Sequence, residues 1–237
     1  MTIVEEIQAE LASLADPERA LQQQKYFKTG AGQYGEGDVF RGIRVPVLRK
    51  VSKKYQELTV EEVEVLLRSA FHEDRLLALL IMVDLYANAN HDENKKQQIY
   101  DSYLRHTAFV NNWDLVDSSA HQIVGAHLMN RSKEPLYELA KSSLLWERRI
   151  AIMATFHYIK RYRFDETLKI AEMLLHDPEN LIHKAVGWML REIGKRNQAT
   201  EEAFLRPIYR QIPRVMLRYA IERFDKEKRR QYLRGRI

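Results

Sequence analysis

The chain has 237 residues with a formal net charge of +5, and 45% of its residues are hydrophobic, which is enough for a sizeable core. It contains no Cys, which excludes disulfides, thiol nucleophiles and Cys-ligated metals and fits a reducing compartment such as the cytoplasm. Only 9 Gly and 6 Pro occur, which disfavours a turn-rich β fold and favours helices joined by short loops.

The N-terminal segment, residues 1–15, is acidic and amphipathic. Its apolar residues recur at helical spacing on one face, at Ile3, Ile7, Leu11 and Leu14. The segment lacks the apolar centre of a signal peptide, and no run in the chain approaches the ~20 apolar residues of a membrane span. Asp16 and Pro17 end this helix and open a second one, with Pro in its first turn.

Residues 29–50, TGAGQYGEGDVFRGIRVPVLRK, hold five of the nine Gly within 13 positions. This composition predicts a loop whose backbone needs positive φ or a close approach to another group. A phosphate-binding loop would need a strand before it and a GK[ST] ending, and neither is present. Two interpretations remain open, namely a connection between helices and a loop that lies beside a ligand.

From residue 59 onward the helical pattern is almost continuous. Thr59 with Glu62 forms a capping signal, and residues 73–89 are apolar on nearly all sides, which predicts a buried helix. No segment shows the alternation of a strand. Further helices are expected near residues 94–108, 113–129, 134–143, 146–161, 165–175, 180–195, 200–211 and 213–224.

These helices pair into three predicted hairpins, over residues 94–129, 134–161 and 165–195. Each unit takes ~30–40 residues, close to the length of HEAT and armadillo repeats, although the sequences of the units resemble one another only weakly. The alternative is an irregular helical bundle. The last residues, DKEKRRQYLRGRI, form either a final capping helix or a frayed basic tail.

The stretch NNWDLVDSSA, residues 111–120, places Trp113 and Asp117 four residues apart, on one face of a helix. Two asparagines precede the helix and are good N-cap residues. Asp114 suits the first turn, where a carboxylate interacts favourably with the helix dipole. Because these residues already supply the cap, a purely structural explanation of Asp117 is weakened. A pocket for a positively charged sugar is the alternative.

The other two tryptophans also lie beside arginines. Trp146 precedes Arg148 and Arg149, and Trp188 precedes Arg191, Lys195 and Arg196. A single Trp on an amphipathic helix is ordinarily a core residue. Three of them interleaved with Arg provide the aromatic faces and guanidinium groups that contact nucleobases.

Other kinds of site find little support in the sequence. The eight His residues show no metal-ligand spacing. Ser118, Ser119 and His121 lie within one turn, where they lack the geometry of a Ser–His relay. No nucleophile elbow and no dinucleotide fingerprint occurs.

The charge is uneven along the chain. Residues 1–140 hold 16 Lys and Arg against 21 Asp and Glu, whereas residues 141–237 hold 22 against 12. A field of positive sign in the C-terminal part suits a polyanion such as nucleic acid. A solvated basic helical surface would have the same composition.

Four blocks of the sequence resemble the AlkD-type DNA alkylation repair glycosylases, in the order found in that family. They are KYFKTG…GEGDVFRGIRVPVLRK, NNWDLVDSSA, WERRIAIMATF and LIHKAVGWMLREIGKR, and the resemblance covers about residues 20–225. It implies an all-α, HEAT-like helical-repeat solenoid of residues 1–237, with a basic concave surface that holds double-stranded DNA. It also implies excision of positively charged alkylated bases, chiefly 3-methyladenine and 7-methylguanine.

The same resemblance assigns roles to individual residues. The family's catalytic Asp matches Asp117, and its two cleft indoles match Trp113 and Trp188. The phosphate-contacting Arg matches Arg149, and a Tyr that shapes the cleft matches Tyr26. Arg191 follows as a backbone contact, Arg148 and Lys195 are further candidate DNA contacts, and Trp146 is expected to be structural.

Two positions depart from the family pattern. Asn112 stands where an aromatic residue is common, and Asn180-Leu181 stands where Phe can occur. These departures affect stacking or strand-distorting contacts and leave the chemistry unchanged. We expect a monofunctional hydrolase without lyase activity, because no Lys is evidently placed as a Schiff-base nucleophile.

The expected enzyme is a cytoplasmic, nucleoid-associated monomer that needs no cofactor and contacts no membrane. Two alternatives remain, namely a non-catalytic protein that binds distorted or branched DNA and a HEAT-like protein–protein scaffold. The resemblance suggests that the indoles flank the deoxyribose while the base stays stacked, whereas many glycosylases flip the base.

Overall fold

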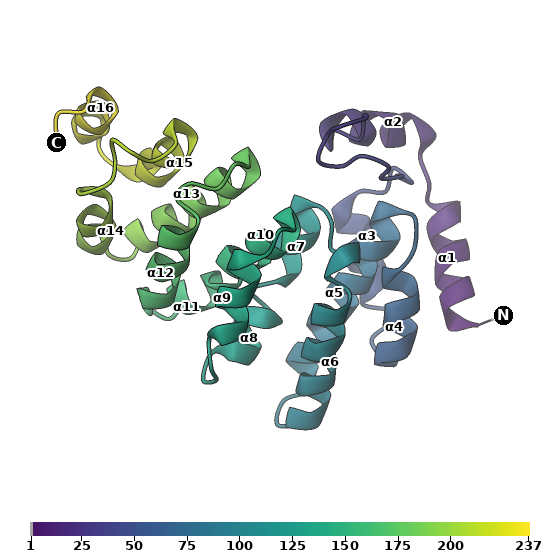
Figure 1. Cartoon of the computed structure of the whole chain (residues 1–237). Coiled ribbons are helices and arrows are strands. Elements are labelled where there is room, and N and C mark those ends of the chain that lie inside the picture. The colour runs from purple at the N-terminus through teal and green to yellow at the C-terminus, as the bar shows by residue number, and fades with distance from the viewer. Residues whose placement is uncertain (1) are drawn as a thin grey trace. The chain divides into compact units, whose positions relative to one another are not determined.

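The computed structural model describes residues 2–237, and the regular elements in that range are helices (Figure 1). Within it, β pairing is limited to an isolated parallel bridge between Val39 and Phe71. The prediction of an all-helical chain is therefore confirmed. The chain forms two compact units, one ending at Ile123 and one spanning Val124–Ile237. That residues 1–237 make a single repeat domain stays a prediction.

The first unit is organised around one long, buried helix, α5 (His72–Asn88), as its continuous apolar run predicted. Four other helices of the unit pack against it, and α4 and α6 stand beside it in Figure 1. Thr59 caps α4 in a capping box with Glu62, as predicted. The remaining elements of this unit are α1 (Ile3–Ser13), α2 (Pro17–Tyr26), α3 (Val45–Ser52), α4 (Val60–Leu67), α6 (Glu93–Arg105), the short 3-10 helix η1 (Thr107–Phe109) and α7 (Trp113–Ser119).

The second unit is organised around α13 (Asn180–Gly194), which packs against α10, α12, α14 and α15. Its predicted hairpins over 134–161 and 165–195 are present as the contacts of α9 with α10 and of α12 with α13. The elements are α8 (Val124–Leu128), α9 (Glu134–Lys141), α10 (Leu145–Ala154), α11 (Phe156–Ile159), α12 (Asp165–Met173), α14 (Gln198–Leu205), α15 (Arg214–Ala220), the 3-10 helix η2 (Ile221–Arg223) and α16 (Lys226–Arg234).

The structure corrects some predicted boundaries. The helix expected over 113–129 ends at Ser119 and resumes at Val124. Between them the backbone makes turn hydrogen bonds, in which the N–H groups of Gln122 and Ile123 both donate to the Ser119 carbonyl at 3.0 Å. The last residues form the helix α16, which ends at Gly235 in the left-handed conformation, so the capping-helix alternative is the right one. No helix in residues 2–237 is long and apolar enough to cross a bilayer.

A buried carboxyl group lies in the second unit where α14 meets the end of α13. Glu201 is 1% exposed, and its Oε1 has no hydrogen-bond partner. A Cβ at position 194 would lie 1.7 Å from Glu201 Oε2, so Gly194 is what leaves room for this carboxyl. Burial, together with the neighbouring Glu202, raises the pKa of Glu201 to about 9.

We expect Glu201→Gln to stabilise the protein increasingly as pH rises from about 5 to 9. In the unfolded chain Glu201 loses its proton near pH 4.5, whereas the folded protein retains it to about pH 9, so folding is penalised over that window. Gln has no proton to lose. Thermal unfolding of both proteins at several pH values measures the difference.

Glu202→Gln is the matched control, because the Glu202 carboxylate accepts a hydrogen bond from Lys228 at 2.7 Å. Replacing this carboxylate by an amide removes the negative charge of the ion pair with Lys228, which should lower the melting temperature at neutral pH. Equal melting temperatures for wild type and Glu201→Gln at pH 8 would contradict the assignment.

Candidate functional site

The helix α7 carries the two residues that the sequence singled out in the first unit. Asn112 is its N-cap, and Trp113 and Asp117 lie one turn apart on one face, both half-buried. The indole of Trp113 stacks on Phe27 with ring centroids 5.4 Å apart and an interplanar angle of 19°. Tyr26, which is 65% exposed, places its ring edge-on to the same indole at 6.0 Å. Three of the predicted residues thus come from two neighbouring elements.

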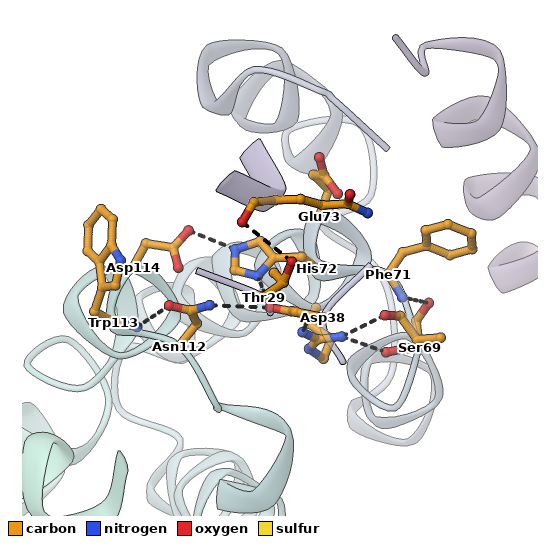
Figure 2. Close-up of polar contacts among 12 residues, drawn as sticks. Thr29, Asp38, Ser69, Phe71, His72, Glu73, Asn112, Trp113 and Asp114 are labelled. Atoms are coloured by element: carbon orange, nitrogen blue, oxygen red, sulfur yellow. Dashed lines mark hydrogen bonds and ion pairs between the residues drawn. The ribbon is translucent and has the colours of Figure 1, made fainter. Parts of the chain in front are cut away.

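A buried imidazole connects α7 to the rest of the first unit. His72 Nε2 lies 2.8 Å from Asp114 Oδ2, and His72 Nδ1 lies 2.8 Å from Asp38 Oδ2 (Figure 2). The Asn112 side-chain amide also donates to Asp38 Oδ2, at 3.3 Å. Arg75 completes the group with an ion pair to the other oxygen of Asp38. Figure 2 shows the His72 ring between the carboxylates of Asp114 and Asp38.

These contacts shift the pKa values of the buried groups. Burial by itself would lower the pKa of His72, but hydrogen bonds and charge from Asp114 and Asp38 outweigh it and raise the pKa to about 9. Burial would likewise raise the pKa of Asp38, but the His72 hydrogen bond and the Arg75 charge hold it below its usual value. Near neutral pH the bridge is therefore an imidazolium between two carboxylates.

The first four residues of α5 are all ionisable and all buried. We name His72–Arg75 the charged anchor; its residues are 2%, 1%, 0% and 4% exposed in chain order. The Glu73 carboxylate accepts backbone N–H bonds from residues 41, 42 and 43, at 2.8 to 3.1 Å. Asp74 binds the Arg41 guanidinium through both carboxylate oxygens.

The Gly-rich loop is the partner of this anchor, and it is a loop over residues 29–44; residues 45–50 belong to α3. Gly42 has a φ of +83°, and a Cβ there would lie 2.1 Å from the Asp16 carbonyl oxygen. Only Gly fits this position, next to the N–H groups that bind Glu73. The loop therefore connects helices as one interpretation proposed, and it also presents Asp38 to His72.

In the second unit, Trp188 is half-buried on α13 and is held by a carboxylate. Its indole N–H donates to Glu192 Oε1 at 3.2 Å, and its ring lies 6.3 Å from Phe156. Lys195 and Arg196 bind the same carboxylate. Burial would raise the pKa of Glu192, but the hydrogen bonds from Lys195 and Arg196 hold it below its usual value.

The predicted arginines of the second unit each have partners within the unit. Arg148 binds Asp177 through two nitrogens and donates to two carbonyls. Arg149 is 5% exposed and donates to the Leu181 carbonyl at 2.6 Å. Arg191 forms an ion pair with Glu222. The DNA contacts assigned to these residues and to Lys195 stay predictions. A DNA contact by Arg148, whose guanidinium binds Asp177 and two carbonyls, is not required for the proposed function.

Sequence reasoning missed His72 and Asp38 and assigned Asp114 only to the helix terminus. One signal was available, because four ionisable residues stand directly before an apolar run that must be buried. Such residues need partners inside the protein. In residues 2–237 no group of His, Asp and Glu is arranged to hold a metal ion.

Comparisons with known proteins identify a family and structures with a similar fold. The family described as "DNA alkylation repair enzyme" matches residues 7–224. The solved structure of a predicted DNA alkylation repair enzyme from Enterococcus faecalis is 18% identical in sequence, with a TM-score of 0.68. The match covers 90% of this chain and 97% of that one, which shows a shared fold. No match was found among curated protein sequences.

We expect the stabilisation provided by the His72 bridge to depend on pH. The raised pKa means that its contribution is complete below about pH 6.5 and is lost as pH rises through about 9. The free-energy difference between wild type and His72→Gln should therefore shrink from pH 6 to pH 10, by about 3 kcal/mol at most. Urea unfolding at both pH values measures it, and a constant difference would contradict the imidazolium.

Proposed function

Because this chain belongs to the family of DNA alkylation repair enzymes, which it matches over residues 7–224, we propose that it is a monofunctional DNA glycosylase. The proposed reaction is hydrolysis of the N-glycosidic bond of cationic alkylpurines, chiefly 3-methyladenine and 7-methylguanine. The proposed substrate is double-stranded DNA, and the protein acts on it as a monomer at the nucleoid of the cytoplasm, with no cofactor and no membrane contact.

The observation that carries this proposal is the arrangement on α7. A carboxylate and an indole share one face of the helix, both half-buried, and the indole is fixed by Phe27 beneath it and Tyr26 at its edge. A ring with an electron-rich face and an acid group beside it suits a positively charged sugar. Asp117 also influences its surroundings electrostatically, since its charge contributes to raising the pKa of buried Tyr103.

The chemistry needs only one carboxylate, because the substrate is already activated. Alkylation at N3 or N7 makes the purine a cation, so the C1′–N bond can break without a general acid, and its electrons neutralise the departing base. Positive charge then develops on the deoxyribose. Asp117 stabilises that charge and positions or deprotonates the water that attacks C1′, leaving an abasic site.

The electrostatic stabilisation that Asp117 can provide is large enough for a single carboxylate to carry the reaction. At an effective dielectric constant of ~20 and a few ångströms, a carboxylate and a cation attract by about 4 kcal/mol. If this is realised mainly in the transition state, it is worth on the order of 10²–10³ in rate. Trp113, and Trp188 as the second indole of the proposal, each add ~1–2 kcal/mol when desolvated.

DNA affinity is proposed to come chiefly from the second unit. Residues 124–237 hold 24 Lys and Arg against 14 Asp and Glu, whereas residues 1–123 hold 14 against 19. Binding of these Lys and Arg side chains to phosphates would release the counterions condensed on the DNA. Arg149 is the proposed phosphate contact, on the resemblance of the WERRIAIMATF block to the sequences of the family.

The first test is release of damaged bases from methylated duplex DNA. Wild type should release free 3-methyladenine and 7-methylguanine, measured by chromatography, and Asp117→Asn should do so on the order of 10²–10³ times more slowly. Binding of the Asn variant to undamaged DNA should stay within about twofold, because the lost interaction belongs to the transition state.

Asp165→Asn is the matched control, because it removes an equal charge from an exposed position at the start of α12. It should excise at the wild-type rate. DNA binding without base release by the wild type would indicate the non-catalytic binder, and neither binding nor release would indicate the scaffold. Both results overturn the proposal.

We expect Arg149→Ala to weaken DNA binding and to flatten its salt dependence. Loss of one phosphate contact should reduce the slope of log K against log salt by about one unit. Fluorescence anisotropy from 50 to 300 mM salt measures the slope. Lys141→Ala is the control, because Lys141 pairs with Glu138 on α9. Equal slopes for Arg149→Ala and wild type would contradict a phosphate role.

A further inference from the structure

The helix that carries Trp113 and Asp117 is too short to hold its own position. It has seven residues, about two turns, and isolated helices of this length are unstable in water. Its N-cap side chain accepts a hydrogen bond from the N–H of Trp113 itself, at 2.9 Å. The position of α7 is therefore decided by its contacts with other elements.

Both chain neighbours of Trp113 bind one buried pair. Asp114 is bound by His72, Asn112 donates to Asp38, and His72 joins Asp38 to Asp114, so the four side chains form a ring that the backbone from Asn112 to Asp114 closes (Figure 2). Asn112 is 0% exposed and His72 is 2% exposed. Since the residues on either side of Trp113 are fixed, the direction in which the indole leaves the backbone is fixed with them.

The Trp113 indole stacks on Phe27, and the aromatic rings that follow beneath it lead to the imidazole of His72. Phe27 stacks on Trp113 and, at 5.0 Å and 20°, on Phe40. The His72 ring lies 4.6 Å from Phe40 and 4.9 Å from Phe27. One residue therefore contributes both to the polar bridge and to the aromatic packing beneath the proposed sugar site.

We propose that His72 is a positioning residue for base excision, which holds α7 so that Trp113 and Asp117 meet the deoxyribose in the productive geometry. This inference rests on the proposed function. Charged groups face His72 from two other elements, Asp38 of the Gly-rich loop and Asp114 of α7, while Arg75 of its own helix shares Asp38. Breaking the bridge removes none of the residues that are proposed to contact DNA and alters only where those residues lie.

The test compares variants on the two sides of the bridge. His72→Gln and Asp114→Ala should reduce the single-turnover rate of base excision by about 10–100-fold, because small displacements of reacting groups are costly. DNA affinity should change by less than about twofold. Asp114→Asn should retain more activity than Asp114→Ala, because its amide oxygen still accepts from His72.

Ser102→Ala controls for loss of stability alone. It removes a 2.7 Å hydrogen bond from a buried hydroxyl on α6 to Glu64 of α4, two helices that contribute no residue to the bridge. This variant should excise at the wild-type rate at a temperature where all variants are folded. Equal loss of activity in Ser102→Ala and His72→Gln would overturn a positioning role.

A spectroscopic measurement tests the bridge without relying on activity. The chain has three Trp, so protein labelled with 5-fluorotryptophan gives three ¹⁹F resonances, and Trp113→Phe identifies one of them. His72→Gln and Asp114→Ala should shift or broaden the Trp113 resonance and leave those of Trp146 and Trp188 in place. An unchanged Trp113 resonance overturns the inference.

The two proposals fail in different ways. Wild type that releases no alkylated base refutes the glycosylase, while the ¹⁹F spectrum still reports whether His72 fixes Trp113. Active wild type together with fully active His72→Gln refutes the positioning role and leaves the glycosylase intact.

Discussion

Four consecutive ionisable side chains buried at the start of α5 impose the constraint on which the first unit depends. Each would be costly to desolvate without partners, and removing one partner would leave another charge unpaired. The partners come from far along the chain, since Asp38 and Asp114 lie 34 and 42 residues from His72. Satisfying the charged anchor therefore fixes the Gly-rich loop and α7 at once.

Part of this could be predicted from the sequence. Helical periodicity, the cap at Thr59 and the apolar run of α5 were sufficient for the all-α class, and the four-residue spacing was sufficient to place Trp113 and Asp117 on one face. The break after Ser119 was not predicted, because the hydrophobic pattern of the sequence continues through it. The bridge through His72 was not predicted either, because pairing between distant segments has no local signature.

A reaction that uses a single acid group, Asp117, needs that group to be positioned accurately, and the buried bridge through His72 can supply the positioning. An activated substrate removes the need for a second carboxylate, so under the proposed function the rate depends on where one carboxylate sits relative to one sugar. A long helix would hold Asp117 by its own packing. A two-turn helix requires external support, and the ring of Asn112, Asp38, His72 and Asp114 supplies it at the end where the indole emerges.

The uneven distribution of charge between the two units also matches what the proposed reaction requires. DNA is a polyanion, and a unit with a net charge of −5 attracts it poorly, whereas a unit with +10 attracts it well. A developing oxocarbenium ion has the opposite requirement, because negative surroundings stabilise it and positive ones oppose it. Under the proposed function, placing Asp117 in the acidic unit and most of the basic side chains in the other would let DNA affinity and transition-state stabilisation increase independently. Within the acidic unit, His72 and Arg75 balance Asp38 and Asp114, so the bridge holds α7 with little net charge of its own.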